Sequence, residues 1–387
     1  ELFHQQYVDI YLAKKTSNLE SFEIYRQTTQ YLIYLIQNGQ ILNEPSLTSL
    51  LDEIKAELVE SNPAIKSPRK ILIKNSGFKN ASAFIDGTIL INIGLLATAQ
   101  SKDEVAFILA HEIAHYHFNH LQRQAIKFTS RANSRPVINK LNKIPEGRMT
   151  LEDLQYVQGW FNQMFYYSRD NELEADSLAI AMIKNSRYDP SVILNTLKSL
   201  KSNYQPLYPL KAQLFDEFIF EELPFKKRWL NPNKVRSSDN LFEHLINNDS
   251  ASTHPSMDER IEQYDQKEYV KDVEPELIPN EISRRLELAL VKTFYDNGQH
   301  DFGIHTALQL KQHYDTTSNL DFQIGRMLYS ITAAINERRL PAVVQSNTDF
   351  YAPESKALNR LSENKRLRKS YKDRFPHESL SKYSDKD

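Results

Sequence analysis

The chain has 387 residues, of which 40% are hydrophobic, and a formal net charge of −2. This size and composition predict a globular protein of two or three domains, and the small net charge argues against a general attraction to nucleic acid or acidic lipid. The chain contains no cysteine, which excludes disulfides and cysteine-type zinc sites and leaves histidine and carboxylate as the strong metal ligands.

The N-terminal region, residues 1–62, is predicted to be helical. Apolar side chains recur at helical spacing over residues 21–37, where Asn38-Gly39 ends the pattern, and again over residues 46–59. We expect these stripes to be packing surfaces. The chain starts at Glu1 rather than methionine, which indicates a cleaved signal peptide or a trimmed chain. We expect no transmembrane segment, since no apolar run approaches the roughly 18 residues of a membrane helix.

Residues 70–96 change to the period of β-strands. Strands are predicted over 70–74, 82–85 and 88–92, and Asp86-Gly87 is a hairpin turn signal between the last two. A strand edge beside the following helix would let an extended peptide add as one more strand. The candidate substrate-binding residues are Asn80, Ala81, Ser82 and Ala83. A purely structural hairpin fits the local sequence equally well.

The next helix, predicted over residues 103–128, contains His111-Glu112-Ile113-Ala114-His115 and begins with the capping-box signature of Ser101 and Glu104. Histidines four residues apart project from one helix face, so both can reach a single metal ion. Glu112 lies where it can contact a metal-bound water without ligating the metal, as in zinc peptidases. The alternative is two ordinary helix histidines, but buried imidazoles need a partner.

Further along, His120 is expected at the surface or the edge of the core rather than as a ligand. The basic stretch to Arg148 contains prolines and a glycine, and we interpret it as a connector.

A long helix is predicted from Thr150 to Lys184, and it contains Glu172 and Asp176 on one face. Zinc needs a third protein ligand beside an open position, and Glu172 can complete the site. Asp176 can accept the free ring N–H of a metal-bound histidine and fix its tautomer. The alternative is a charged helix face with pairs four residues apart.

The H-E-x-x-H sequence, followed on a later helix by Ser-Arg-x-x-Glu-x-x-Ala-Asp at residues 168–176, resembles the HtpX and CAAX-prenyl-protease type of zinc metallopeptidase. The resemblance covers about residues 70–265 and favours the soluble branch, which includes periplasmic proteases that clear stalled outer-membrane proteins. It implies one zinc ion per chain. The resemblance implies that the zinc ligands are His111, His115 and Glu172. It also implies that Glu112 is the general base and that Asp176 contacts one of the ligands.

The resemblance also places His254, in Thr253-His254-Pro255, near the metal. There His254 would either donate to the developing oxyanion or occupy the open zinc position and hold the enzyme inactive; a histidine before proline is otherwise an ordinary loop residue. Arg260 is a candidate partner for a carboxylate of the site. The aromatic, proline-containing stretch 200–250 is either a lid over a cleft or an insertion with its own small core.

Residues 278–340 are again predicted to be helical, with a helix pair over 286–297 and 302–313 around Gly298 and a faint likeness to tetratricopeptide repeats. These helices would recruit a protein partner or cover the catalytic domain. The polar stretch from 346 is predicted to be a mobile tail.

The sequence therefore predicts an α+β, mostly α fold with a zincin-like metallopeptidase core, a small sheet beside the metal helix and extra helices at both ends. The expected regions are N-terminal helices (1–62), the peptidase domain (63–265), C-terminal helices (270–345) and a tail (346–387).

The expected function is a periplasmic or otherwise exported zinc endopeptidase, with membrane association left open and no nucleic-acid partner. Its substrates would be unfolded or stalled polypeptides. A zinc-bound chaperone or assembly factor, with cleavage gated or absent, is the alternative.

Overall fold

A computed structural model of the chain describes residues 28–29, 31–123, 169–201, 207–208, 257–265, 275–314 and 318–336. Its sheet has four strands in the order β1-β2-β4-β3. The strands are β1 (Ile41–Leu42), β2 (Lys70–Lys74), β3 (Ala81–Ala83) and β4 (Thr88–Asn92). β2 and β4 are parallel, whereas β1 and β3 each run antiparallel to their neighbour. β3 is therefore an edge strand of this sheet.

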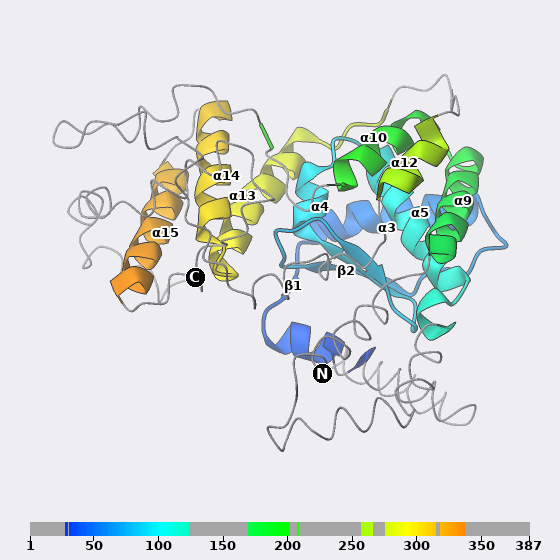
Figure 1. Cartoon of the computed structure of the whole chain (residues 1–387), viewed down its shortest axis with the longest axis horizontal. Helices are drawn as coiled ribbons and strands as arrows, with labels where there is room; N and C mark the ends of the chain where they lie inside the picture. Colours follow the sequence, from blue (N-terminus) through cyan, green and yellow to red (C-terminus); the bar gives the residue numbers. More distant parts are fainter. Residues whose placement is uncertain are drawn as a thin grey trace, which may run out of the picture.

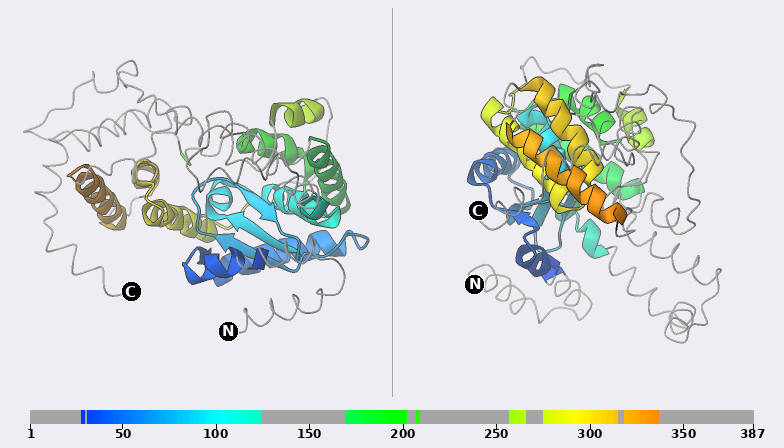
Figure 2. Two further views of the ribbon diagram at one scale, coloured as in Figure 1. Left: turned by 60° about the horizontal axis from the view of Figure 1, so that its bottom comes forward. Right: turned by 90° about the vertical axis from the view of Figure 1, so that its left-hand side faces the viewer.

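The two central strands are buried on both faces, which explains their unbroken apolar sequences. Ile71 and Ile89 face the main core, whereas Leu72 and Leu90 pack with Leu32 and other residues of the helical stretch 31–37. Successive strand side chains alternate between faces, so the sheet separates two apolar layers. Figure 2 shows that stretch and helix α3 in blue beside the sheet.

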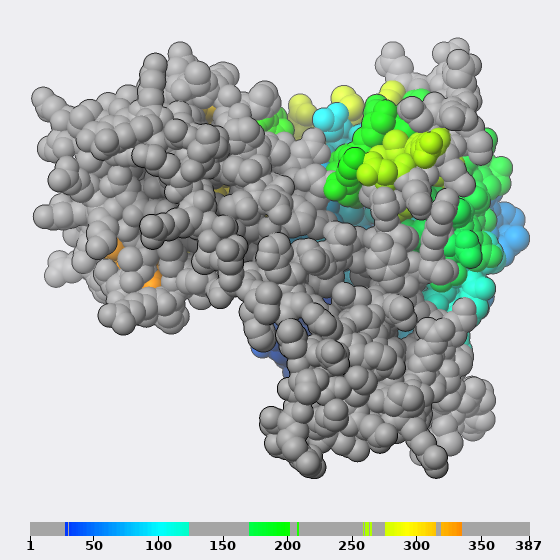
Figure 3. Space-filling view, in the orientation of Figure 1, coloured from blue at the N-terminus to red at the C-terminus, as the bar shows by residue number. Residues whose placement is uncertain are grey.

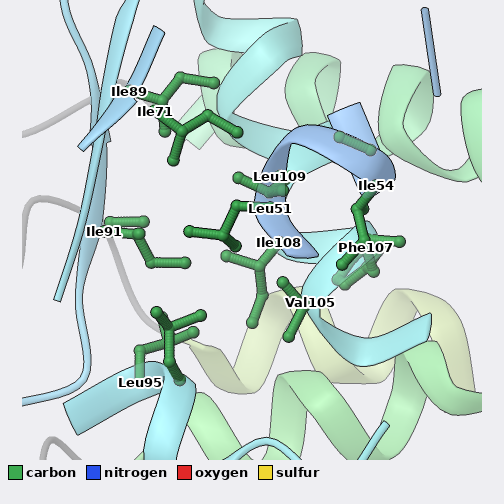
Figure 4. Packing of buried hydrophobic residues seen from close by; sticks show 14 of the residues in the cluster. Leu51, Ile54, Ile71, Ile89, Ile91, Leu95, Val105, Phe107, Ile108 and Leu109 are labelled. Atoms are coloured by element: carbon green, nitrogen blue, oxygen red, sulfur yellow. The ribbon is translucent and has the colours of Figure 1, made fainter. Parts of the chain in front are cut away.

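The larger core lies between the sheet, α3 (Pro45–Glu60), α4 (Ile93–Thr98) and α5 (Lys102–His117). Figure 4 shows side chains from these four parts meeting, among them Leu51 of α3, Ile91 of the sheet and Ile108 of α5. The buried residues of α3 are those of the predicted stripe: Leu47, Leu50, Leu51, Ile54 and Leu58. α5, whose residues 105–110 are all apolar, is thus fixed on several sides, and it carries the histidine motif.

Several predicted boundaries are confirmed, and two differ. The strand predicted over 82–85 is β3, which spans Ala81–Ala83. The strands over 70–74 and 88–92 occur as predicted, and Gly87 at the hairpin has a positive φ of 85°. The metal helix was predicted to reach residue 128, but α5 ends at His117. Asn119 then adopts φ 55°, in the left-handed region, before a short helical stretch at 120–123. Sequence analysis missed β1 and α4.

A second group of helices follows along the chain: α9 (Arg169–Asn185), the 3-10 turn η1 (Pro190–Val192), α10 (Ile193–Leu200) and α12 (Met257–Asp265). α9 packs along α5, and α12 packs on α10 (Figure 1). The segment of the predicted long helix before Arg169 lies outside the described residues, as do His254, nearly all of the predicted lid and the tail.

The C-terminal helices α13 (Asn280–Asp296), α14 (His300–His313) and α15 (Ser318–Asn336) pack on one another (Figure 2). The turn at Gly298, with φ 69°, separates the predicted helix pair. α13 packs on α4. Phe294 of α13 also lies against Gly77 of the loop before β3, so closely that a Cβ on residue 77 would sit 2.1 Å from the ring.

The predicted α+β, mostly α fold with helices at both ends is confirmed, while the domain boundaries stay a prediction. Within the described ranges, no helix combines the length and apolar character needed to span a bilayer.

Candidate metal centre

α5 places both histidines of the motif and the intervening glutamate in the interior. His111, Glu112 and His115 are 5%, 2% and 1% exposed. The helix starts where predicted, because the Ser101 hydroxyl accepts a hydrogen bond from the backbone N–H of Glu104 at 3.2 Å. The Glu104 carboxylate reaches back to the N–H of Gln100 at 3.0 Å, one residue before the expected partner. The start of the helix sets which face carries the motif.

α9 brings Glu172 to the two histidines. The Nε2 atoms of His111 and His115 lie 2.9 Å apart, and each is 3.4 Å from a carboxylate oxygen of Glu172. These three residues are the one His/Asp/Glu group among the described residues whose arrangement could hold a metal ion. Figure 3 shows α9, α10 and α12 at the outer surface, whereas the three ligand candidates are buried.

The separations between these three donor groups fit a zinc ion. Nitrogen and oxygen ligands at about 2.0–2.2 Å from a tetrahedral zinc are separated from one another by about 3.3–3.6 Å. Each ring nitrogen lies at such a distance, 3.4 Å, from one oxygen of Glu172, His111 from Oε2 and His115 from Oε1. The two ring nitrogens would have to separate by only about 0.4 Å. Two imidazoles and one carboxylate are also a donor set found in catalytic zinc sites, which leave a fourth position open.

Asp176, one turn after Glu172 on α9, supports this group through His111. Its Oδ1 lies 2.8 Å from Nδ1 of His111, the ring nitrogen directed away from Glu172. Arg260 of α12 holds the same carboxylate by two hydrogen bonds of 2.7 Å, from Nε and Nη2. Its Nη1 also lies 3.1 Å from Glu172. The predicted pairing of Arg260 with a carboxylate is thus confirmed, and it ties α12 to α9.

The charges of the side chains in this site are balanced by these pairs. Burial and the charge of Arg260 both lower the pKa of His111, but Asp176 and Glu172 outweigh them and raise this pKa to about 9. Burial works to raise the pKa of Asp176, yet Arg260 and His111 hold it below its ordinary value. Asp176 and Glu172 therefore each have a positively charged side chain beside them. A metal ion that binds Nε2 of His111 would displace the proton from that nitrogen.

Of the two places predicted for His120, the surface is wrong. It is 0% exposed, because the turn at Asn119 folds the chain back beside α5, and it is not in the group that could hold a metal ion. Its Nδ1 lies 2.8 Å from Nδ1 of His115, and its Nε2 lies 2.8 Å from Glu174 of α9. His115, the second histidine of the motif, is thus supported by the pair of His120 and Glu174. The H-x-x-x-x-H spacing of His115 and His120 is the signal that sequence analysis did not use.

Three of the predicted substrate-binding residues form the edge strand β3, and Asn80 directly precedes it. β3 packs against α5. The backbone N–H of Phe84 donates to the carbonyl of Thr88, and the carbonyl of Asn80 accepts from the N–H of Asn92. Because pairing alternates along an antiparallel strand, the N–H and C=O groups of Ala81 and Ala83 point away from β4. The hairpin is held by Asp86, which accepts from the backbone and hydroxyl of Thr88.

Comparison with known proteins points to one family. The model of peptidase family M48 matches residues 45–268. The beta-barrel assembly-enhancing protease of Escherichia coli K12 is 26% identical over 222 residues, which are 55% of this chain and 45% of that protein. The Yersinia pestis protein of the same name is 26% identical over 181 residues, 44% of this chain and 36% of that protein.

A Vibrio cholerae protein is 28% identical over 184 residues, 45% of this chain and 37% of its own length. The chain thus spans less than half the length of each of these curated relatives. The family match confirms the resemblance found in the motifs.

Proposed function

The chain belongs to peptidase family M48, a metallopeptidase family, and from this premise we propose that it is a zinc-dependent endopeptidase. His111, His115 and Glu172 hold one zinc ion per chain, and Glu112 is the general base. The observation that carries the proposal is the convergence of three buried donor groups from α5 and α9: the two histidine Nε2 atoms lie 2.9 Å apart, and each lies 3.4 Å from a different carboxylate oxygen of Glu172. Residues far apart in the chain would not be expected to make that shape by chance.

Each side chain of the site has a task in this proposal. The zinc ion, when bound, would polarise the scissile carbonyl and lower the pKa of a water molecule towards 7. Glu112 takes a proton from that water and delivers it to the leaving amide nitrogen. Asp176 accepts the Nδ1–H of His111, which directs Nε2 towards the metal. His254, outside the described residues, is proposed as the oxyanion donor or as an inhibitory ligand.

We propose that the substrate is bound along β3. The backbone groups of Ala81 and Ala83 are directed away from β4, and an extended peptide can pair with such groups as an added strand. Asn80 and Ser82 face β4 with their backbone and hold the strand in register. This recognition uses main-chain groups and is compatible with substrates of varied sequence, as unfolded polypeptides would be.

The biological setting is proposed from the relatives. Their name describes proteases that enhance β-barrel assembly, and this favours a role in envelope protein quality control in the periplasm. The substrates would then be unfolded or stalled polypeptides, and the C-terminal helices would offer a surface for a protein partner.

The proposal is tested with Glu112→Gln and a permanently unfolded test protein. The variant should bind zinc as the unaltered chain does but cleave roughly a hundredfold to ten-thousandfold more slowly, since a general base contributes about that much. Zinc content is measured by atomic absorption, and cleavage by gel and mass spectrometry. Glu60→Gln, the same exchange at an exposed position of α3, is the matched control and should cleave normally.

Full activity of Glu112→Gln would overturn the assignment of the base. Glu172→Ala should lose zinc, and unchanged metal content there would mean that a different third ligand exists. Zinc-dependent binding of the test protein without cleavage by the unaltered chain would favour the chaperone alternative. In that case a gain of activity in His254→Ala would instead identify an inhibitory histidine.

A further inference from the structure

The C-terminal helices hold two residues that come from another part of the chain. Leu207 and Tyr208 belong to the aromatic stretch after α10, and the Gln309 side chain of α14 binds their backbone. Its Oε1 accepts from the N–H of Leu207 at 3.2 Å, and its Nε2 donates to the carbonyl of Tyr208 at 2.5 Å. A side-chain amide that donates and accepts in this way recognises the main chain of a dipeptide, whatever its side chains are.

The side chain of Tyr208 is recognised separately. Its hydroxyl donates to Oε1 of Glu287 on α13 at 2.6 Å, and its ring stacks on that of His313, with centroids 3.8 Å apart. The other oxygen of Glu287 accepts from the hydroxyl of Tyr314 at 2.7 Å. Burial raises the pKa of Tyr208, and Glu287 adds to this effect, so the hydroxyl keeps the proton that it donates. A phenylalanine could not make this hydrogen bond, so the contact selects tyrosine.

The binding groups are built into the helices, whereas the residues that they hold lie over them. Glu287 and Gln309 are 5% and 1% exposed, but Leu207 and Tyr208 are only half-buried. Loss of the dipeptide would leave Oε1 of Glu287 and both polar atoms of Gln309 without these partners, and buried polar groups without partners are costly. A tyrosine-containing segment of another polypeptide would satisfy the same three atoms.

The contacts that retain the dipeptide are few. In the described part of the chain, three hydrogen bonds and one ring stack join it to α13 and α14, besides the packing of the Leu207 side chain against the main core. Pro206 and Pro209 on either side have no backbone N–H to donate. The dipeptide is therefore kept in place chiefly by its tether, and a free segment can compete with it.

We propose that Glu287, Gln309 and His313 form a binding site for tyrosine-containing segments of polypeptides, and that the chain's own Leu207 and Tyr208 occupy this site until another segment displaces them. The site gives the C-terminal helices a recognition function of their own. It does not rest on the proposed peptidase activity, because none of its residues belongs to the metal centre.

The test uses the whole chain with its own dipeptide weakened. The double variant Leu207→Pro/Tyr208→Ala lacks the backbone donor and the phenol. The probe is N-acetyl-Pro-Leu-Tyr-Pro-amide, which has the sequence of residues 206–209, and the side-chain amide signal of Gln309 is followed by NMR. The signal should shift saturably. The unaltered chain should bind the peptide roughly tenfold more weakly, because the tethered segment competes.

A second peptide, N-acetyl-Pro-Leu-Phe-Pro-amide, tests the selection of tyrosine. It should bind the double variant roughly fivefold or more weakly, since it leaves the buried carboxylate without its donor. Adding Glu287→Leu removes the acceptor, so the two peptides should then bind alike. Glu281→Leu, the same exchange at an exposed position of α13, is the matched control and should keep the preference for tyrosine.

The proposal is overturned if the tyrosine peptide does not shift the signal of the double variant, or if the phenylalanine peptide binds that variant equally well. Equal affinity of the unaltered chain and the double variant would also overturn it, because the chain's own segment would then not be a competitor. If the double variant does not fold, Tyr208→Phe is titrated in its place, and it should bind the tyrosine peptide more tightly than the unaltered chain does.

Discussion

Arg260 is the residue on which the electrostatics of the metal centre depend. It is 4% exposed and contacts two carboxylates, the one that holds His111 and the one proposed to bind zinc. Two buried carboxylates one helical turn apart repel each other, so their proximity is stable only with a cation beside them. Arg260 also comes from α12, six residues after His254 in the chain, and thereby fixes α12 against the metal helices.

Replacing Arg260 should therefore destabilise the metal-free protein. Arg260→Met leaves Asp176 buried without its bidentate partner, a change that typically costs about 3–5 kcal/mol. The free energy of unfolding is measured in urea with a chelator present. Arg285→Met, at an exposed pair on α13, should change stability by less than about 0.5 kcal/mol. Equal effects of the two variants would show that the buried pair is not stabilising.

His120 should affect metal affinity rather than the chemical step. It lies between His115 and Glu174, at 2.8 Å from each, and residues that orient a metal-binding imidazole typically change affinity about 10–100-fold. We expect His120→Phe to weaken zinc binding by that factor, measured by competition with a chromophoric chelator. His117→Phe is the control, because His117 accepts from the backbone of Lys66 instead. Equal affinity of the His120 variant and the unaltered chain would contradict this role.

The two kinds of site residue differ in how far the sequence predicts them. Histidines at positions 111 and 115 share a helix face because of their spacing alone, and the same reasoning applies to Glu172 and Asp176. His120 could not be placed this way, since its position depends on the left-handed conformation of Asn119, which a non-glycine residue seldom adopts. The pairing of Arg260 depends on how α12 packs, which a local pattern does not encode.

At the scale of elements, the edge strand is anchored by a buried lysine. Lys79, just before β3, donates from Nζ to the carbonyl and hydroxyl of Ser199 in α10, at 2.7 and 3.0 Å. Burial lowers the pKa of Lys79 to about 8, from 10.5, against a smaller opposing effect of Glu104. Burying the charged form therefore costs stability, although the hydrogen bonds hold α10 beside the proposed substrate strand.

This arrangement predicts how stability depends on pH. Below about pH 8, Lys79 is protonated in both the folded and the unfolded state, so the whole cost of burying its charge is present. Between pH 8 and 10.5 only the unfolded state keeps the proton, and the free energy of unfolding rises by up to about 3 kcal/mol. Lys79→Met should remove this rise. At pH 7 it should stabilise the chain by about 1–2 kcal/mol, which is the relieved cost of about 3 kcal/mol after subtraction of the two lost hydrogen bonds.

Urea unfolding at pH 7, 8, 9 and 10 measures the effect. Lys292→Met, at an exposed helix pair, is the control and should keep the pH dependence. A Lys79→Met protein that is less stable at pH 7, with an unchanged pH profile, would contradict the assigned cost of burial.

The elements themselves were predictable where a local pattern specifies them. The stripe of α3 and the Asp86-Gly87 hairpin follow from side-chain period and turn chemistry. The parallel pairing of β2 with β4 could not be predicted from a local pattern. The connection between these two strands contains β3, which pairs antiparallel with β4. The two-residue strand β1 is too short for a period-2 pattern to be detected.

At the scale of the whole molecule, the metal centre is a link between parts that are distant in the chain. α5 and α9 provide the proposed ligands, α12 provides Arg260, and η1 and α10 pack against α5. The C-terminal helices instead dock through Phe294 on the loop before β3 and on α4, so they contact the peptidase part on a different side from α9 (Figure 1). Metal binding should therefore stabilise α5 and α9 more than the C-terminal helices.

Removal of the metal tests this expectation. A ligand that binds only the folded state stabilises it by about 2.7 kcal/mol at a concentration 100 times its Kd, and zinc would join α5 to α9. We expect a chelator to lower the melting temperature and to speed amide hydrogen exchange in α9 and the C-terminal half of α5, with little change in α13 to α15. In Glu172→Ala, which lacks the carboxylate contributed by α9, the chelator should have no such effect. Uniformly faster exchange through all helices, or none in α9, would show that the cation does not hold these two helices together.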